Sequence, residues 1–332
     1  MTEDTKICAV IVAYQPNIAQ LSLLVKSLKK QVDHVIIIDN TPKVDQHQNI
    51  SEFLNQECVD SSFSTSYFGL DDNLGIGYAQ NIGIEHSFAF GADYVLLLDQ
   101  DSIPSPNLVS CLLDSLRSSR KKLINIIAAS PRYRDPRTGL SSHFIVSRFQ
   151  IPCRYKPKYK KAPENIVLAS FLISSGTLID APMLQELRGM RSDYFIDHVD
   201  TEWCLRAQHK GYKLIGVHDA LMEHSLGEKP RKFWFFGMRN VSEHTPLRDY
   251  YMFRNTLLML RDVEMPVTWK IFLLFRLVEF FVFFLTFSKE RILRFRMMKL
   301  GLLHGINNIR GKLNVQTLLC DPIPKTALDP SN

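Results

Sequence analysis

The chain has 332 residues, of which 45% are hydrophobic and 22% charged, and its formal net charge is +6. A chain of this length and composition can bury a large core, which excludes a disordered protein. Its 6 cysteines include no Cys-x-x-Cys pair, so neither a disulfide framework nor a zinc site is expected, and a reducing cytosolic compartment is the simplest inference. Glu3 and Asp4 precede the first apolar run, where a signal peptide would carry basic residues.

The first part of the chain alternates strand and helix patterns. Residues 7–13 are continuously apolar and predict a buried strand that ends at Tyr14-Gln15-Pro16. Apolar residues then recur at helical spacing over 21–28, and a second buried strand is predicted at 35–38. This strand, helix, strand order with short connections is typical of the parallel sheet of an α/β protein.

Three glycines mark the entry to the next predicted helix, which ends near Gly91. They are Gly75, Gly77 and Gly83, within the segment 72–83. Glycines near a helix start let the backbone approach a ligand, and the free amide groups there favour phosphate. Their spacing does not match the dinucleotide-binding fingerprint. The alternative is a helix entry that packs closely on the sheet.

Two carboxylates follow a short strand predicted at 95–98, where the chain leaves the core. Asp99 and Asp101 stand two residues apart, a spacing that lets both reach one hard cation through oxygen ligands. In open α/β sheets, ligands bind beyond the carboxyl ends of the strands, which is where this pair lies. The pattern therefore predicts a Mg²⁺ or Mn²⁺ site, with a solvated acidic turn as the alternative.

The middle of the chain is less regular. A helix is predicted near 106–118, and strands at 124–129 and 166–173. Between these strands, residues 131–163 are rich in proline, arginine, lysine and tyrosine with little periodicity, which predicts a long functional or mobile loop. The small residues 174–177 predict a turn that either floors a pocket or permits a tight crossing.

A short helix is predicted to begin near Asp200 and to end before Gly211. Three acids crowd its N-terminus beside His198: Asp197, Asp200 and Glu202. Helix capping and the helix dipole account for one or two acids there, so three suggest a further role. A strand at 212–217 is predicted next, and His218 and His224 come after it.

The C-terminal part is aromatic and basic. The apolar run 271–287 is interrupted by Arg276 and Glu279, and basic residues follow it at Lys289, Arg291, Arg294, Arg296 and Lys299. This pattern favours an amphipathic helix that lies in the membrane interface and is held by anionic lipid. The alternatives are a spanning helix, since a central charge costs only about 3 kcal/mol on insertion scales, and a buried core or dimer helix.

Taken together in this order, the motifs from about residue 6 to 260 resemble those of the inverting family-2 glycosyltransferases of the GT-A fold, and within them the bacterial rhamnosyltransferases of surface polysaccharide synthesis. The resemblance implies an α/β fold, with a Rossmann-like, mostly parallel sheet flanked by helices. The aromatic and basic pattern beyond it adds a C-terminal helical membrane-associating extension. The glycosyltransferase domain would span 1–240, with a nucleotide-sugar half at about 1–120 and an acceptor half at 121–240. The extension would span 241–318, followed by a tail at 319–332.

The resemblance also implies roles for particular residues. It places the nucleoside of the donor, and the ribose or metal contact, at Ala13, Tyr14, Asp39, Asn40, Asn73, Gly75, Asn81 and Asp99. It places the metal at Asp99 and Asp101, with His224 completing the site, and an ordinary surface histidine as the alternative for His224. Asp200 falls at the position of the catalytic base. The family usually has an acidic pair there, whereas this chain has Val199 before Asp200, so Asp197 is the substitute candidate.

The implied reaction is a metal-dependent single displacement at the anomeric carbon, which inverts its configuration. Arg206 or Arg254 would add charge to the leaving diphosphate, or form a structural ion pair instead. The implied donor is dTDP-L-rhamnose, with a UDP-hexose as the alternative. The implied acceptor is a glycan on a polyprenyl diphosphate at the cytoplasmic face of the bacterial inner membrane, where the protein would be peripheral. An anionic membrane surface is an expected partner and nucleic acid is not. A non-catalytic, membrane-bound glycan-binding protein is the rival from another class.

Overall fold

The computed structural model describes residues 5–42, 64–121, 123–136, 139, 141–155, 165–224, 231–234, 238–241, 244–288 and 290–314. Its first elements are β1 (Ile7–Ala13), α1 (Ile18–Leu28), β2 (His34–Asp39), β3 (Ser64–Gly69), α3 (Ile76–Phe90), β4 (Tyr94–Asp99), β5 (Ser102–Pro104), α4 (Leu108–Arg120) and β6 (Ile126–Arg134). The predictions for 7–13, 21–28, 35–38 and 95–98 are confirmed, because long apolar runs and helical periodicity are local signals.

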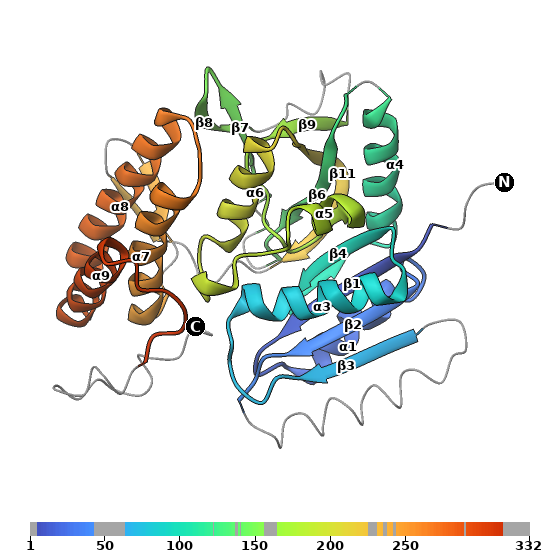
Figure 1. The fold of residues 1–332 in the computed structure, drawn as a ribbon, viewed down its shortest axis with the longest axis horizontal. Helices are drawn as coiled ribbons and strands as arrows, with labels where there is room; N and C mark the ends of the chain where they lie inside the picture. The colour runs from blue at the N-terminus through green and yellow to red at the C-terminus, as the bar shows by residue number, and fades with distance from the viewer. Residues whose placement is uncertain are drawn as a thin grey trace.

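The second part of the chain contains β7 (Phe144–Arg148), β8 (Ile151–Tyr155), β9 (Ile166–Ala169), β10 (Thr177–Asp180), α5 (Ala181–Glu186), the 3₁₀ helix η1 (Ser192–Tyr194), α6 (Val199–His209), β11 (Lys213–His224), β12 (Arg231–Trp234), β13 (Met238–Val241), α7 (Pro246–Asp262), α8 (Val267–Phe287) and α9 (Arg291–Ile306). Figure 1 shows the sheet flanked by helices, with α7, α8 and α9 gathered at one side. The predicted α/β class is confirmed.

A nine-stranded sheet runs through the molecule in the order β3-β2-β1-β4-β10-β6-β11-β5, with β9 paired to β11. The strands β3, β2, β1 and β4 are parallel neighbours. Beyond them, β10 is antiparallel to both β4 and β6, and β5 and β9 are antiparallel to β11. The prediction of a mostly parallel sheet is therefore wrong for this half, where the sheet is mixed.

Both faces of the sheet are covered. Successive residues of β1 alternate between two hydrophobic clusters, as the pleat of a strand requires, with Ala9 and Ile11 on one face and Val10 on the other. Helices α1 and α4 pack on the first face. Residues of α3, α5, α6, α7 and α8 pack on the second. A strand buried on both faces explains why these sequences are continuously apolar.

Two predicted segments differ from the structure. The described part of the supposed loop 131–163 contains the end of β6 and the hairpin formed by β7 and β8, which pair antiparallel. The predicted strand 212–217 continues as β11 to His224. Both were missed because these strands mix polar and apolar residues, and pairing partners far away in the sequence stabilise them.

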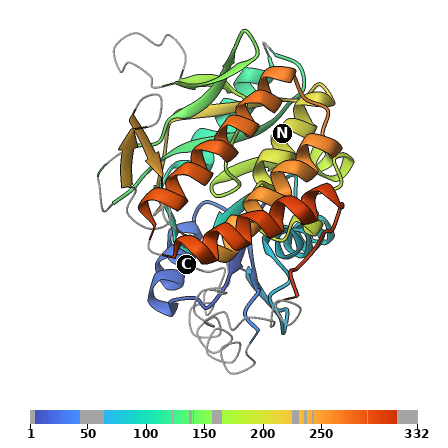
Figure 2. The same ribbon diagram turned by 90° about the vertical axis from the view of Figure 1, so that its left-hand side faces the viewer.

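The three C-terminal helices form a layer of their own, and Figure 2 shows α8 and α9 on the outside of it. Helix α9 approaches α7 closely: a Cβ atom at Gly301 would lie 2.4 Å from the carbonyl oxygen of Tyr250. Within the part of the chain that the structure describes, none of the helices is long and apolar enough to cross a membrane, α8 included. The division at 240 stays a prediction, and the tail 319–332 lies outside the described residues.

A buried ion pair joins α9 to α7. Arg294 is 3% exposed, and its Nη1 donates to Oδ2 of Asp249 at 2.8 Å. Its Nη2 also donates to the carbonyl oxygen of His244. Burial raises the pKa of Asp249, and the charge of Arg294 opposes that rise. Arg294 was expected among the membrane-facing basic residues, and the structure places it in the interior instead.

We expect Arg294→Met to lower the free energy of unfolding by about 3 kcal/mol, because it leaves a buried carboxylate without its partner. Chemical denaturation followed by circular dichroism measures the change. Arg296→Met is the matched control, because Arg296 is exposed on the same helix. Equal stability of the two variants would show that the pair contributes nothing.

Candidate active site

The carboxyl ends of three neighbouring strands bring together residues that are far apart in the sequence. Because β2, β1 and β4 are parallel, Ala13 lies opposite Asp39, and Val12 lies opposite Asp99. The strand-end residues predicted to hold a nucleoside and a cation therefore share one edge of the sheet. This is the edge at which open α/β sheets bind ligands.

Gln100, between the two predicted metal ligands, fixes the end of β1. Its Oε1 accepts from the backbone amide of Tyr14 at 2.7 Å, and its Nε2 donates to the carbonyl oxygen of Tyr14 at 3.0 Å. The side chain of Gln100 thus pairs with the backbone of Tyr14 as a neighbouring strand would. The sequence singled out Tyr14 but gave no signal for Gln100, because the contact depends on the register of β1 against β4.

Asp39 is buried at the end of β2, and its carboxylate accepts hydrogen bonds within the protein. Its Oδ1 accepts from the backbone amide of Thr41 at 3.0 Å, and its Oδ2 accepts from the hydroxyl of Tyr67 at 3.0 Å. Burial, followed by the charge of Asp39, raises the pKa of Tyr67 well above its usual value, so the phenol stays a proton donor. Tyr67 lies on β3, a strand that the sequence analysis did not predict.

The segment 73–81 connects the carboxyl ends of the strands to the turn that precedes α6. Oδ1 of Asn73 accepts from the Asn40 side chain and from the backbone amide of Gly75, both at 3.0 Å. Gly75 has a φ of +90°, and a Cβ atom there would lie 2.5 Å from the carbonyl oxygen of Phe195. Glycine is required at this position by both its conformation and its close contact.

Asn81 points to a neighbouring backbone segment. Its Nδ2 donates to the carbonyl oxygen of Met190 at 2.9 Å, and its Oδ1 accepts from the amide of Met190 at 2.7 Å. The side chain thus ties α3 to the segment that leads into η1 and α6. The contacts favour the packing alternative for this part of the glycine-rich segment.

Asp99, Asp101 and His224 form a cluster whose ligand atoms all lie within 4.8 Å of one another. Nε2 of His224 lies 3.8 Å from Oδ2 of Asp99, and its Nδ1 lies 3.2 Å from Oδ1 of Asp101. His224 reaches the two aspartates because β11 pairs with β5, in a register that sets it opposite Ser102. The histidine is 5% exposed, which argues against an ordinary surface residue.

Two serines hold the cluster in place. The Ser102 hydroxyl lies 3.0 Å from Nδ1 of His224 and 2.6 Å from the hydroxyl of Ser175. The hydroxyl oxygen of Ser175 in turn accepts from the backbone amide of Asp99 at 3.0 Å. Two carboxylates and an imidazole suit Mg²⁺ or Mn²⁺, with coordination positions left for a substrate. The donor set therefore fits a divalent cation.

The electrostatics of the cluster also suit a cation. Burial raises the pKa of Asp99 to about 6; the charges of Asp101 and Asp200 add to the rise, and His224 and Arg248 oppose it. For His224, burial alone would lower the pKa, but its hydrogen bond with Asp101 and the nearby carboxylates raise it overall. Negative charge is therefore concentrated at the cluster. The charge of Asp200 raises the pKa of Asp99, as the charge of Asp101 does.

The turn before α6 is strained. Phe195, Asp197 and His198 have φ values of +67°, +62° and +63°, a region that residues other than glycine seldom adopt. Asn255 on α7 stabilises the turn by donating from Nδ2 to the carbonyl oxygens of Tyr194, Ile196 and Asp197, at 2.9, 2.7 and 3.0 Å. Held strain of this kind is typical of functional sites.

The two candidate bases differ in their partners. Oδ1 of Asp197 accepts from Nη2 of Arg248 at 2.6 Å. Burial would raise the pKa of Asp197, but the charge of Arg248 and this hydrogen bond lower it below the usual value. The pKa of Asp200 is raised, mainly by burial, although hydrogen bonds with Ser174 oppose the rise. Asp200 is therefore the better proton acceptor of the two.

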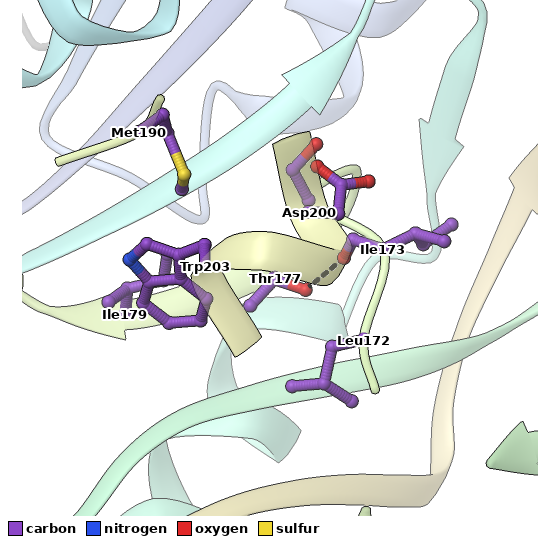
Figure 3. A pocket seen from close by; sticks show the side chains of 8 residues that line it. Leu172, Ile173, Thr177, Ile179, Met190, Asp200 and Trp203 are labelled. Carbon is purple, nitrogen blue, oxygen red and sulfur yellow. Dashed lines mark hydrogen bonds between the residues drawn. The ribbon is translucent and has the colours of Figure 1, made fainter. Parts of the chain in front are cut away.

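Figure 3 shows Asp200 and Trp203 on α6 beside the turn that carries Ile173. The cavity between them has a volume of about 10 Å³. That is room for about one water molecule, so this cavity is no substrate pocket. The half-buried carboxylate of Asp200 thus has apolar packing on this side, which accounts for the rise in its pKa.

The structure favours structural roles for both candidate arginines. Arg206 donates from Nε and Nη2 to the carboxylate of Glu202, at 2.8 and 3.0 Å, and from Nη2 to the carbonyl oxygen of Gly189. Arg254 is fully buried and donates to the carbonyl oxygens of Tyr194 and Gly311, at 2.9 and 2.6 Å. The contacts favour the ion-pair alternative for Arg206, whereas the partners of Arg254 are backbone carbonyl oxygens.

Comparison with known proteins adds a family and a fold. A family model described as "Glycosyl transferase family 2" matches residues 8–176. The chain is 29% identical over 316 residues to the dTDP-rhamnosyl transferase RfbF of Shigella flexneri, which covers 93% of this chain and 98% of that protein. It is 31% identical over 111 residues to the galactofuranosyltransferase GlfT1 of Mycolicibacterium smegmatis, which covers 33% of this chain and 34% of that protein.

Solved structures show the same fold at low identity. The S. aureus TarS 1-349 structure aligns with a TM-score of 0.50 and 12% identity, over 91% of this chain and 81% of that one. The same protein in complex with UDP-GlcNAc aligns with a TM-score of 0.52 and 12% identity, over 92% and 82%. These likenesses concern the fold alone.

Proposed function

The chain belongs to glycosyl transferase family 2 and is a glycosyltransferase, and we propose that it transfers L-rhamnose from dTDP-L-rhamnose to a lipid-linked glycan with inversion at the anomeric carbon. The observation that carries this proposal is the convergence of Asp99, Asp101 and His224 at the strand ends, within electrostatic reach of Asp200. The rhamnosyl donor is supported by the 29% identity to RfbF over nearly the full length of both chains.

In the proposed reaction, Asp200 accepts the proton of an acceptor hydroxyl as that oxygen attacks the anomeric carbon. The bond from that carbon to the diphosphate oxygen breaks, and the nucleoside diphosphate leaves. A Mg²⁺ or Mn²⁺ ion held by Asp99, Asp101 and His224 would neutralise the charge of the leaving group. Arg248 keeps Asp197 ionised and hydrogen-bonded, which leaves Asp200 as the group that accepts the proton.

The nucleoside of the donor is proposed to lie along the strand ends. The backbone at Ala13 and Tyr14, the buried Asp39 and Asn40, and the start of α3 at Asn73 and Gly75 surround that position. Asn81 supports it indirectly, through Met190. None of these contacts selects a particular sugar, so a UDP-hexose remains the alternative donor.

A panel of nucleotide sugars tests the proposal. The full-length protein is incubated with dTDP-rhamnose, UDP-glucose, UDP-galactose and UDP-GlcNAc in the presence of Mn²⁺, and release of nucleoside diphosphate is measured. We expect turnover with dTDP-rhamnose to exceed that with the UDP sugars by at least about tenfold, the lower end of what one group of the wrong size costs in a pocket. Equal or faster turnover of a UDP sugar would overturn the donor assignment.

We also propose that α8 and α9 dock on the cytoplasmic face of the inner membrane, where the protein would act as a peripheral enzyme of O-antigen or capsule-type synthesis. An aliphatic stripe runs along the outer side of α8, where Val267, Ile271, Leu274 and Val278 are 70%, 62%, 46% and 54% exposed. On α9, the exposed Ile292 and Leu303 share the surface with Arg291, Arg296 and Lys299. Apolar and basic side chains together suit an anionic lipid surface.

Changing the stripe tests this docking. We expect the double variant Ile271→Glu, Val278→Glu to lose most of its binding to vesicles containing anionic lipid, because two carboxylates replace apolar area that would enter the interface. Co-sedimentation with the vesicles measures binding. Leu23→Glu is the matched control, because Leu23 is 56% exposed on α1 in the first half of the chain. Unchanged co-sedimentation of the double variant would exclude the stripe as the docking surface.

A further inference from the structure

A cavity of about 490 Å³ lies beside the strained turn, and its lining does not include the Asp99, Asp101 and His224 cluster or Asp200. It is bounded by the β7–β8 hairpin, the N-terminal end of α6, α7 and the inner side of α8. Its volume is in the range of sites that bind small molecules or a segment of a larger ligand. Helix α8 contacts the hairpin directly, since Thr268 donates to the carbonyl oxygen of Gln150.

The walls of the cavity are mainly apolar and aromatic. Met252 from α7 and Trp269, Leu273, Leu277 and Phe280 from α8 line it. Because a helix repeats every 3.6 residues, these α8 residues lie on the side opposite the exposed aliphatic stripe. One helix therefore has an apolar cavity behind it and a proposed membrane-docking surface in front of it.

Most polar groups at the cavity already have partners within the protein. Asp197 is paired with Arg248, and Nε2 of His198 lies 2.8 Å from the hydroxyl of Thr256. His198 is neutral, because burial lowers its pKa to about 4. A ligand would therefore find few polar partners there and would gain mainly from burial of its own apolar surface.

Two arginines line the cavity; Glu279 compensates the charge of Arg276, so the exposed Arg154 supplies the positive character. Arg154 is exposed on β8, and Arg276 lies on the facing wall formed by α8, paired with Glu279 at 2.6 Å. The acid of the lining, Asp197, is neutralised by Arg248. A guanidinium group beside an apolar cavity suits a ligand that joins a phosphate group to a hydrocarbon chain.

We propose that this cavity binds the lipid end of the acceptor, an isoprenoid chain carried on a diphosphate, with Arg154 facing the diphosphate. This inference rests on the proposed function, in which the acceptor is lipid-linked. The chain would reach the cavity past α8 from the membrane side. The glycan would extend along Asp197 and Thr201, which line the cavity on the same helix end that carries Asp200.

Binding of farnesyl diphosphate in the presence of a chelator tests the site without any turnover. The chelator removes divalent cations, so the diphosphate is not captured at the Asp99 cluster. We expect wild type to bind farnesyl diphosphate at least about tenfold more tightly than inorganic pyrophosphate by calorimetry, because only the former fills the apolar walls. Equal affinity for the two probes, or no binding of farnesyl diphosphate, would overturn the proposal.

Two variants locate the binding. Cys153→Phe enlarges a side chain that lines the cavity, and Arg154→Gln removes a charge on the same strand. We expect each to weaken farnesyl diphosphate binding by about tenfold, the scale of one charge-assisted hydrogen bond or a few buried methylenes. Arg148→Gln is the matched control, since Arg148 is exposed on the same hairpin and is not part of the lining. Equal weakening in the control, or none in the two variants, would place the ligand elsewhere.

Kinetics with two acceptors then separates lipid from glycan. The same glycan is offered either on a polyprenyl diphosphate or on a short water-soluble aglycone. We expect Cys153→Phe to raise KM for the lipid-linked acceptor alone, by about tenfold. An equal rise for both acceptors would assign the cavity to the glycan instead. Failure of dTDP-rhamnose as donor would leave the farnesyl diphosphate result unaffected, so the two proposals fail separately.

Discussion

Asp200→Asn is expected to lower the rate of sugar transfer by about 10²- to 10⁴-fold, the contribution of a positioned general base. The amide has the shape of the carboxylate and keeps a hydrogen bond from Ser174 through its carbonyl oxygen, but it does not accept the proton of the acceptor hydroxyl. Nucleotide binding should stay near the wild-type value, because Asp200 lies on α6 and the proposed nucleoside site lies at the ends of β1 and β2. Steady-state transfer and calorimetric titration with dTDP measure the two properties.

Asp197→Asn is the comparison that identifies the base. Because Asp197 is paired with Arg248, its replacement should lower the stability of the protein and loosen the turn before α6. Asp200 should still accept the proton. Activity should also fall as the pH is lowered through the raised pKa of Asp200, at a higher pH than an ordinary aspartate would give. Full turnover by the Asp200→Asn variant would end this assignment.

Asp101→Ala is expected to weaken metal affinity by more than about a hundredfold, since a direct ligand should matter more than the outer-shell partners whose loss costs 10- to 100-fold. Donor binding should lose its dependence on Mg²⁺ or Mn²⁺, because Asp99 and His224 alone offer two ligands. Calorimetry with dTDP-rhamnose, with Mn²⁺ and with a chelator, separates the effect on the metal from the effect on the nucleotide.

Asp114→Ala removes an exposed aspartate of α4 and is the matched control. His224→Ala should reproduce the Asp101→Ala result, because its ring nitrogens lie 3.2 and 3.8 Å from the two aspartates. Wild-type donor binding that is the same with and without the chelator would rule out the role of the metal in binding.

The strand-end part of the site was predictable from the sequence, because it depends on local patterns. Apolar runs in the sequence indicate buried strands, and parallel neighbours bring their carboxyl ends together. The common location of Ala13, Asp39 and Asp99 therefore follows from short stretches of sequence. His224 was predicted only through resemblance to a family. Its place opposite Ser102 depends on the pairing of β5 with β11, which no local pattern encodes.

The remainder depends on contacts between distant segments. Gln100 and Tyr67 were missed because their partners, Tyr14 and Asp39, come from other strands. Arg206 and Arg254 looked like phosphate ligands as isolated basic residues, whereas their surroundings supply a carboxylate and backbone carbonyls. A basic residue in the sequence shows its charge but not what surrounds it.

Arg254 and Asn255 form a clamp on the turn before α6, because both donate to its backbone carbonyl oxygens. This clamp affects how truncated forms of the enzyme should be interpreted. Both residues lie on α7, which also packs against α9. A shortened protein that ends before Pro246 would lose the C-terminal helices together with the clamp on the backbone next to Asp200. Inactivity of such a fragment would therefore say nothing about the membrane, and point changes on the outer side of α8 are the cleaner way to separate anchoring from catalysis.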